Sequence, residues 1–194
     1  MTKFPNAVFQ GLDIAISQVQ RYNDEGKKLL GDAHDRMSAI QGDLTQPRTE
    51  LDDPQWYGFD AAIISMALHH VQDPVLILTR LRERVRQGGT VVIVDFLKMP
   101  SSDGGAAKQS QRRVHERANE STRGRGHEYD PADMVKGTVG PKVWPGFTQE
   151  EIGADMAAAG CCDVEVTEFG ELVFVPVGPM EGGGRIFMAK GTVS

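Results

Sequence analysis

The chain has 194 residues, of which 40% are hydrophobic and 25% are charged, an ordinary composition for a globular protein with a substantial core. Its formal net charge of −6 argues against a general binder of nucleic acid or of anionic membranes, because both partners attract basic surfaces. No apolar run is long enough for a transmembrane helix. We therefore expect a single domain over residues 1–194, with no membrane or nucleic-acid partner.

The first third of the chain alternates strand and helix patterns. Residues 7–12 form a short apolar run that predicts a strand ending at Asp13. Ile14 to Leu30 shows near-helical spacing of apolar residues, although Gly26 is a potential break. Residues 37–41 predict a second strand, followed by Gly42 and Asp43.

The middle of the chain has the clearest pattern. Residues 59–65 predict a strand buried on both faces. Asp73 and Pro74 are typical of a helix N-cap and first helical position, and Gly88-Gly89 ends that helix. Residues 90–96 are rich in β-branched residues and predict another buried strand. A strand, a helix and a strand in this order predict a right-handed βαβ unit with parallel strands.

The last third begins with weakly patterned residues 99–147, which we interpret as a lid or insertion. Thr148 and Glu151 have the spacing of a capping box at the start of a helix. Three further strands are expected at 163–167, 172–177 and 185–190, the last two joined through glycine-rich turns. The pattern predicts an α/β sheet, mostly parallel, with one antiparallel strand near the edge.

Three polar residues stand at predicted carboxyl ends of strands, where ligands bind in open α/β sheets: Asp13, Asp43 and Ser65. A carboxylate offers two acceptor oxygens, which match the two vicinal hydroxyls of a ribose, and it also accepts from an adenine amino group. The alternative for each aspartate is a loop residue or a helix cap.

Five segments in order resemble the motifs of class I S-adenosylmethionine-dependent methyltransferases, which have a Rossmann-like fold. They are residues 11–15, residues 42–44, residues 59–74, residues 81–90, and residues 146–152 with Ala159-Gly160. The resemblance implies S-adenosylmethionine as cofactor. It implies that Asp13, with Ile14, binds the adenosyl ribose, and that Asp43 and the amide of Leu44 meet adenine. Ser65 and Met66 are further implied contacts at the end of the fourth strand of the family.

The family opens with a strand and a Glu/Asp-x-Gly-x-Gly-x-Gly loop, for which residues 1–6 offer no counterpart. We therefore expect a methyltransferase sheet that is missing its first strand, that binds the cofactor poorly as an isolated chain, and that has two unpaired strand edges. A partner chain that completes the sheet is one expectation that follows.

His69 and His70 follow the fourth-strand segment, where the family places residues facing the transferred methyl group. A neutral histidine can take a proton from an acceptor hydroxyl or amine, which makes both candidates for a catalytic role. The alternative is that one packs in the core and the other caps the next helix. Methyl transfer depends mainly on in-line placement, so a dedicated base is not required.

Three functions compete on these grounds. The first is methyl transfer to a small-molecule acceptor, and the second is a non-catalytic relic or partner subunit. A nicotinamide-dependent dehydrogenase is disfavoured because no G-x-G-x-x-G precedes Asp13. Cys161 and Cys162 are adjacent and lack zinc or disulfide spacing, so we expect two buried or half-buried thiols, no metal site and a cytoplasmic location.

Overall fold

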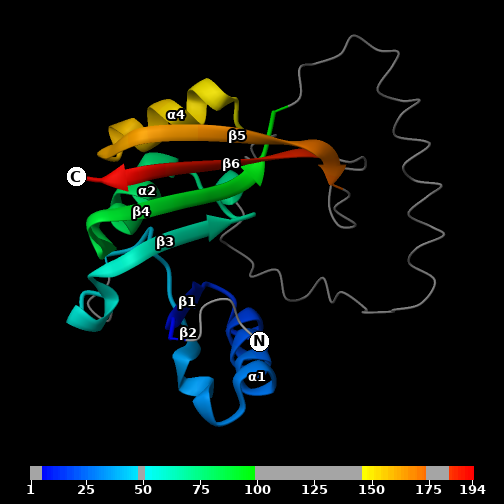
Figure 1. Cartoon of the computed structure of the whole chain (residues 1–194), viewed down its shortest axis with the longest axis vertical. Coiled ribbons are helices and arrows are strands. Elements are labelled where there is room, and N and C mark those ends of the chain that lie inside the picture. Colours follow the sequence, from blue (N-terminus) through cyan, green and yellow to red (C-terminus); the bar gives the residue numbers. More distant parts are fainter. Residues whose placement is uncertain (1–5, 48–50, 99–145, 174–183) are drawn as a thin grey trace, which may run out of the picture. The chain divides into compact units, whose positions relative to one another are not determined.

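The computed structural model describes residues 6–47, 51–98, 146–173 and 184–194 (Figure 1). Most of the predicted lid therefore lies outside the described residues. The described residues up to Asp53 form one compact unit, and those from Pro54 onward form another. The expectation of a single domain over 1–194 stays a prediction.

The first unit is a two-stranded parallel sheet with one helix. Its elements are β1 (Phe9–Asp13), α1 (Ile16–Leu30), the 3-10 helix η1 (Gly31–Arg36) and β2 (Met37–Gln41). Phe9 pairs with Met37 and Asp13 pairs with Gln41, in parallel register along both strands. The predicted strand–helix–strand order and the parallel pairing are confirmed.

Two residues of α1 fix this helix against β2. The side chain of Asn23 accepts a hydrogen bond from the amide of Ala39 at 2.7 Å and donates to the carbonyl of the same residue at 3.1 Å. Gly26 is buried and does not break the helix, contrary to the potential break seen in the sequence. A Cβ at Gly26 would lie 2.7 Å from the carbonyl oxygen of Met37, so the absence of a side chain permits the close approach.

The second unit is a four-stranded sheet in the order β3-β4-β6-β5. Its strands are β3 (Phe59–Ser65), β4 (Val85–Phe96), β5 (Cys161–Val173) and β6 (Gly184–Val193). β3 and β4 are parallel, while β6 is antiparallel to both β4 and β5. The structure confirms the predicted parallel pair and the antiparallel strand in the closing hairpin.

Two helices pack on this sheet and contact each other, α2 (Pro74–Arg84) and α4 (Gln149–Ala158) (Figure 1). Both begin as the sequence predicts. The carboxylate of Asp73 accepts from the amide of Leu76 at 3.0 Å, and Thr148 with Glu151 forms a complete capping box. The core between the helices and the sheet includes fully buried Leu78, Ile93, Ile152, Met156 and Phe187.

Contrary to the sequence prediction, Gly88-Gly89 does not end the helix that begins at Pro74. That helix ends at Arg84, and both glycines lie within β4.

The structure corrects three further details of the sequence interpretation. β3 is not buried on both faces, since Ile63 is 66% exposed; β3 is an edge strand, and no described strand pairs with its other edge. The described residues of the two strands predicted at 163–167 and 172–177 belong to one strand with register shifts, and 174–177 lie outside the described residues. Cys161 is buried as expected, but Cys162 is exposed.

The close approach at Gly26 predicts that alanine destabilises the protein at this position, although alanine favours helices more than glycine does. Gly26→Ala should lower the free energy of unfolding by about 1–3 kcal/mol, because the new methyl group overlaps the backbone of Met37. Gly153→Ala in α4 is the matched control, since a Cβ there meets nothing within 4 Å. It should raise stability by up to about 1 kcal/mol. Urea denaturation followed by far-UV circular dichroism measures both, and equal stabilisation by the two changes would contradict the packing argument.

Candidate functional site

The carboxyl ends of β1 and β2 bring the two predicted cofactor aspartates to one edge of the first unit. The amide of Gly42 donates to the carbonyl of Asp13 at 3.0 Å, and the side chain of Gln41 donates to the carbonyl of Ile14 at 3.0 Å. These bonds place Asp43 and Leu44 directly after a strand whose end is tied to the segment that contains Asp13 and Ile14. The predicted arrangement of both aspartates at successive strand ends is present.

Each aspartate also has a local structural role, as the alternative interpretation expected. Oδ1 of Asp13 accepts from the amide of Ala15 at 2.8 Å. Oδ1 of Asp43 accepts from the amide of Thr45 at 2.8 Å and from its hydroxyl at 2.7 Å. No described residue donates a hydrogen bond to Oδ2 of either carboxylate. The turns therefore orient both carboxylates and leave Oδ2 of each without a hydrogen bond from the described residues.

The carboxyl end of β3 carries the next two predicted contacts, Ser65 and Met66, in the second unit. Ser65 is exposed and pairs with Val94 of β4. Met66 has φ +54°, a left-handed conformation that costs a residue other than glycine roughly 1 kcal/mol. A hydrogen bond of 2.8 Å from the Met66 amide to the carbonyl of Val94 holds this conformation, which ends the strand and turns the chain toward the histidines.

The structure separates the two predicted catalytic histidines, which both lie in the 3-10 helix η3 (Leu68–His70). His69 is only 6% exposed, and its ring Nδ1 lies 2.7 Å from Oδ1 of Asp95. His70 is exposed, and its ring centroid lies 4.0 Å from that of His69. His69 is therefore the packed member of the pair, and His70 is the one that solvent can reach.

Sequence reasoning missed Asp95, which is fully buried in β4. Its carboxylate accepts from the ring and the backbone amide of His69 and from the amide of Phe96. A signal was present in the sequence, because Asp95 is the only charged residue between Thr90 and Phe96. A charged residue within a buried strand requires hydrogen-bonding partners, and His69 was a candidate partner.

The environment of His70 favours its neutral form. Partial burial of the ring lowers the pKa of His70 below its ordinary value, and the neighbouring His69 lowers it further, while Asp95 opposes both effects. A neutral imidazole at neutral pH has one unprotonated ring nitrogen. His70 can therefore accept a proton, which is the chemistry required of a general base.

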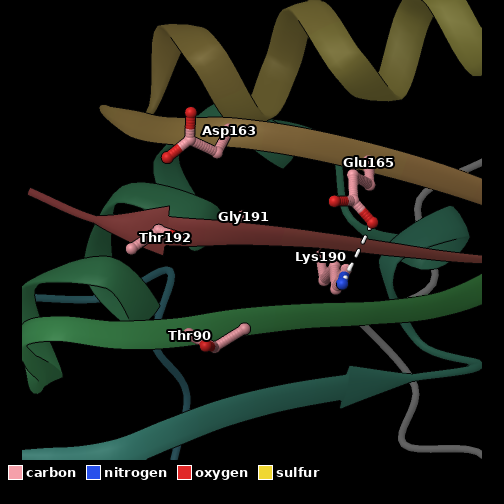
Figure 2. Close-up of a pocket in the computed structure, with 6 residues that line it drawn as sticks. All are labelled: Thr90, Asp163, Glu165, Lys190, Gly191 and Thr192. Carbon is pink, nitrogen blue, oxygen red and sulfur yellow. Dashed lines mark ion pairs between the residues drawn. The ribbon is translucent and has the colours of Figure 1, made fainter.

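A hollow of about 140 Å³ lies elsewhere on the four-stranded sheet (Figure 2). It is lined by Thr90, Asp163, Glu165, Lys190, Gly191 and Thr192. An ion pair of 3.0 Å joins Lys190 to Glu165. Thr90 pairs with Ala61 near the start of β3, so the hollow does not lie at the carboxyl edge where ligands bind in such sheets. None of the predicted site residues lines it.

Two other features bear on the class of site. Among the described residues, no three His, Cys, Asp or Glu side chains gather as a metal site would require. No described helix is both long and apolar enough to cross a bilayer.

Comparison with known proteins gives matches in structure only. No protein-family model and no curated protein matches the sequence. A geranyl diphosphate methyltransferase solved with S-adenosylmethionine has a TM-score of 0.56 and 12% identity, and the match covers 97% of this chain and 69% of that one. Phosphoethanolamine N-methyltransferase 2 of Haemonchus contortus has a TM-score of 0.54 and 11% identity, with 94% and 42% coverage. The chain has the fold of class I S-adenosylmethionine-dependent methyltransferases.

The Rossmann-like α/β fold predicted from the sequence is thereby confirmed. An O-methyltransferase family protein from Burkholderia thailandensis gives the same result, with a TM-score of 0.52, 14% identity, and coverage of 98% of this chain and 45% of that one. The chain thus spans less than half the length of two of these three proteins and about two thirds of the third.

The lowered pKa of His70 predicts a pH-dependent effect on stability. As the pH falls below the ordinary value near 6.5, the unfolded chain binds this proton more readily than the folded chain, so stability falls with pH. His70→Gln removes this contribution. The stability of the wild-type protein relative to His70→Gln should therefore decrease between about pH 7.5 and pH 5.5. Urea denaturation of both proteins across this range measures the difference in stability. A difference that does not change with pH would contradict the lowered pKa of His70.

Proposed function

We propose that the protein transfers a methyl group from S-adenosylmethionine to a small-molecule acceptor. The observation that carries the proposal is the placement of Asp13 and Asp43 at the ends of two adjacent parallel strands, each with one carboxylate oxygen not used by its own turn. The fold supports it, as do the neighbours of this fold that were solved with S-adenosylmethionine.

Asp13 is assigned to the ribose of the cofactor and Asp43 to the adenine amino group. A carboxylate that accepts from a ribose hydroxyl or an amino group makes a charge-assisted bond, which is stronger than a neutral one. Ile14 and the amide of Leu44 are the accompanying contacts in the first unit. Ser65 and Met66 are assigned to the cofactor at the carboxyl end of β3 in the second unit.

His70 is assigned to the acceptor rather than to the cofactor. When bound, S-adenosylmethionine supplies an electrophilic methyl group on a sulfonium centre. Transfer to a hydroxyl or an amine releases a proton, and the neutral ring of His70 accepts it. His69 has no direct role in this assignment, because its ring is buried and bound to Asp95.

The acceptor class follows from the charge of the chain and from its neighbours. A net charge of −6 is unfavourable for a nucleic-acid substrate. Two structural neighbours carry names of small-molecule substrates, geranyl diphosphate and phosphoethanolamine, which both support a small acceptor without identifying it. A cytoplasmic location is part of the same proposal, supported by the free cysteines of the described chain.

A partner chain that completes the sheet is a further part of the proposal. Its support is the edge of β3, where Ile63 is 66% exposed and no described strand pairs. Edge strands with exposed apolar residues are templates for pairing with another segment.

Charge-removing variants test the cofactor assignment while preserving the turns. Asp13→Asn and Asp43→Asn keep an oxygen that can accept from Ala15 or Thr45, so the local structure should persist. Each should weaken binding of S-adenosylmethionine by roughly tenfold or more, since a hydrogen bond to a charged group contributes about 1.5–3 kcal/mol. Equilibrium dialysis with the labelled cofactor measures this.

Asp24→Asn is the control, because it removes the same charge from an exposed position on α1 of the same unit. It should leave the affinity unchanged. Equal affinities of the wild-type protein and of the variants at Asp13 and Asp43 would contradict the proposal. Absence of any binding would favour the non-catalytic alternative.

A further inference from the structure

The carboxylate of Asp95 ties the end of β4 to the loop that follows β3. Its Oδ1 accepts from the ring Nδ1 of His69 and from the amide of Phe96, both at 2.7 Å. Its Oδ2 accepts from the backbone amide of His69 at 3.2 Å. Both oxygens are used, as a fully buried carboxylate requires, and two of the three bonds go to His69.

This arrangement determines the hydrogen position on His69. An ionised carboxylate only accepts hydrogen bonds, so Nδ1 of His69 must be the donor. In a neutral ring the proton then resides on Nδ1, and Nε2 is unprotonated. A carboxylate behind a histidine fixes its tautomer and ring orientation in the same way at many functional sites.

The ring of His69 in turn contacts two other rings. Its centroid lies 5.2 Å from that of Phe96 in an edge-on arrangement and 4.0 Å from that of His70. His69 is almost completely buried, so it has little freedom to move away from either neighbour. The orientation of the exposed His70 ring therefore depends on a ring that Asp95 holds in place.

We propose that Asp95 is a positioning residue that acts through His69 to hold the ring of His70 at the carboxyl end of β3. Asp95 and His69 do not touch the substrate in this arrangement; they restrict the rotamers of the residue that does. The part of this inference that concerns turnover rests on the proposed methyl transfer. The part that concerns the tautomer of His69 and the order of His70 does not.

Nitrogen-15 NMR of the histidine rings tests the structural part in the wild-type protein. His69 should give the signature of a ring protonated at Nδ1. A signature of protonation at Nε2 alone would overturn the proposal, because Asp95 would then not receive the ring hydrogen. This measurement needs neither cofactor nor activity.

Two variants test whether the effect reaches His70. Asp95→Asn replaces one carboxylate oxygen with an NH2 group. In either orientation that NH2 group faces a backbone amide donor, so the asparagine cannot reproduce all three bonds and the tautomer of His69 should become mixed. His69→Gln removes the ring but keeps the backbone amide that donates to Asp95. Both should change the ring resonances of His70, and unchanged resonances in both would overturn the proposal. If Asp95→Asn fails to fold, His69→Gln and the wild-type spectrum still decide.

Kinetics then test the consequence for methyl transfer. Asp95→Asn and His69→Gln should each lower kcat at least tenfold with little change in the KM for the cofactor, and the double variant should be no worse than the more impaired single variant. Asp60→Asn, which removes an exposed carboxylate from β3, is the matched control and should leave kcat unchanged. If the losses in kcat of the two single variants multiply in the double variant, the claim that Asp95 acts through His69 is overturned. An inactive wild-type protein with the predicted tautomer would refute the methyl-transfer proposal alone.

Discussion

The buried carboxylate of Asp95 is the constraint on which the carboxyl edge of the larger sheet depends. Moving a carboxylate out of water costs several kcal/mol unless hydrogen bonds replace its hydration. Asp95 is fully buried, and the three donors that satisfy it come from His69 and Phe96. The chain after β3 must therefore return to the end of β4. The left-handed conformation of Met66 and the short helix η3 are the path by which it does so.

In the smaller unit, polar groups at strand ends also fix the local structure, but through different hydrogen bonds. There, the strands β1 and β2 are short and half exposed, and backbone contacts between Asp13 and Gly42 hold their ends together. The aspartates use one oxygen for their own turns, which orients the other. Both carboxylate oxygens of Asp95 accept hydrogen bonds from the fold, whereas only one oxygen of Asp13 and of Asp43 does so among the described residues. This contrast separates a supporting carboxylate from carboxylates suited to a ligand.

The sequence predicted helix starts well, because the hydrogen bonds that cap a helix join residues close together in the chain. Asp73 with Pro74 and Thr148 with Glu151 mark helix starts through bonds to residues three positions away, so no tertiary information is needed. The parallel and antiparallel pairings followed from the order of strands and helices. The potential break at Gly26 did not occur, because the reason for that glycine lies in β2, eleven residues farther along the chain.

The site was predictable from the sequence only in part, because some of its contacts join residues that are far apart in the chain. Asp13 and Asp43 stand at the ends of recognisable strands, and their position alone indicated a shared edge. His69 and His70 are adjacent and identical in type, so the sequence could not tell which one is buried. That distinction depends on Asp95, which lies 26 residues after His69 and meets it only in the folded protein. The exposure of Ile63 likewise depends on which strands pair with β3.

A map of backbone amide chemical shifts on addition of S-adenosylhomocysteine tests whether the cofactor binds at the ends of β1 and β2, because it locates binding without requiring turnover. The largest changes should fall on residues 13–15 and 42–45, around the ends of β1 and β2. Changes confined to the hollow between Thr90 and Lys190, or no changes at saturating ligand, would contradict binding at these strand ends.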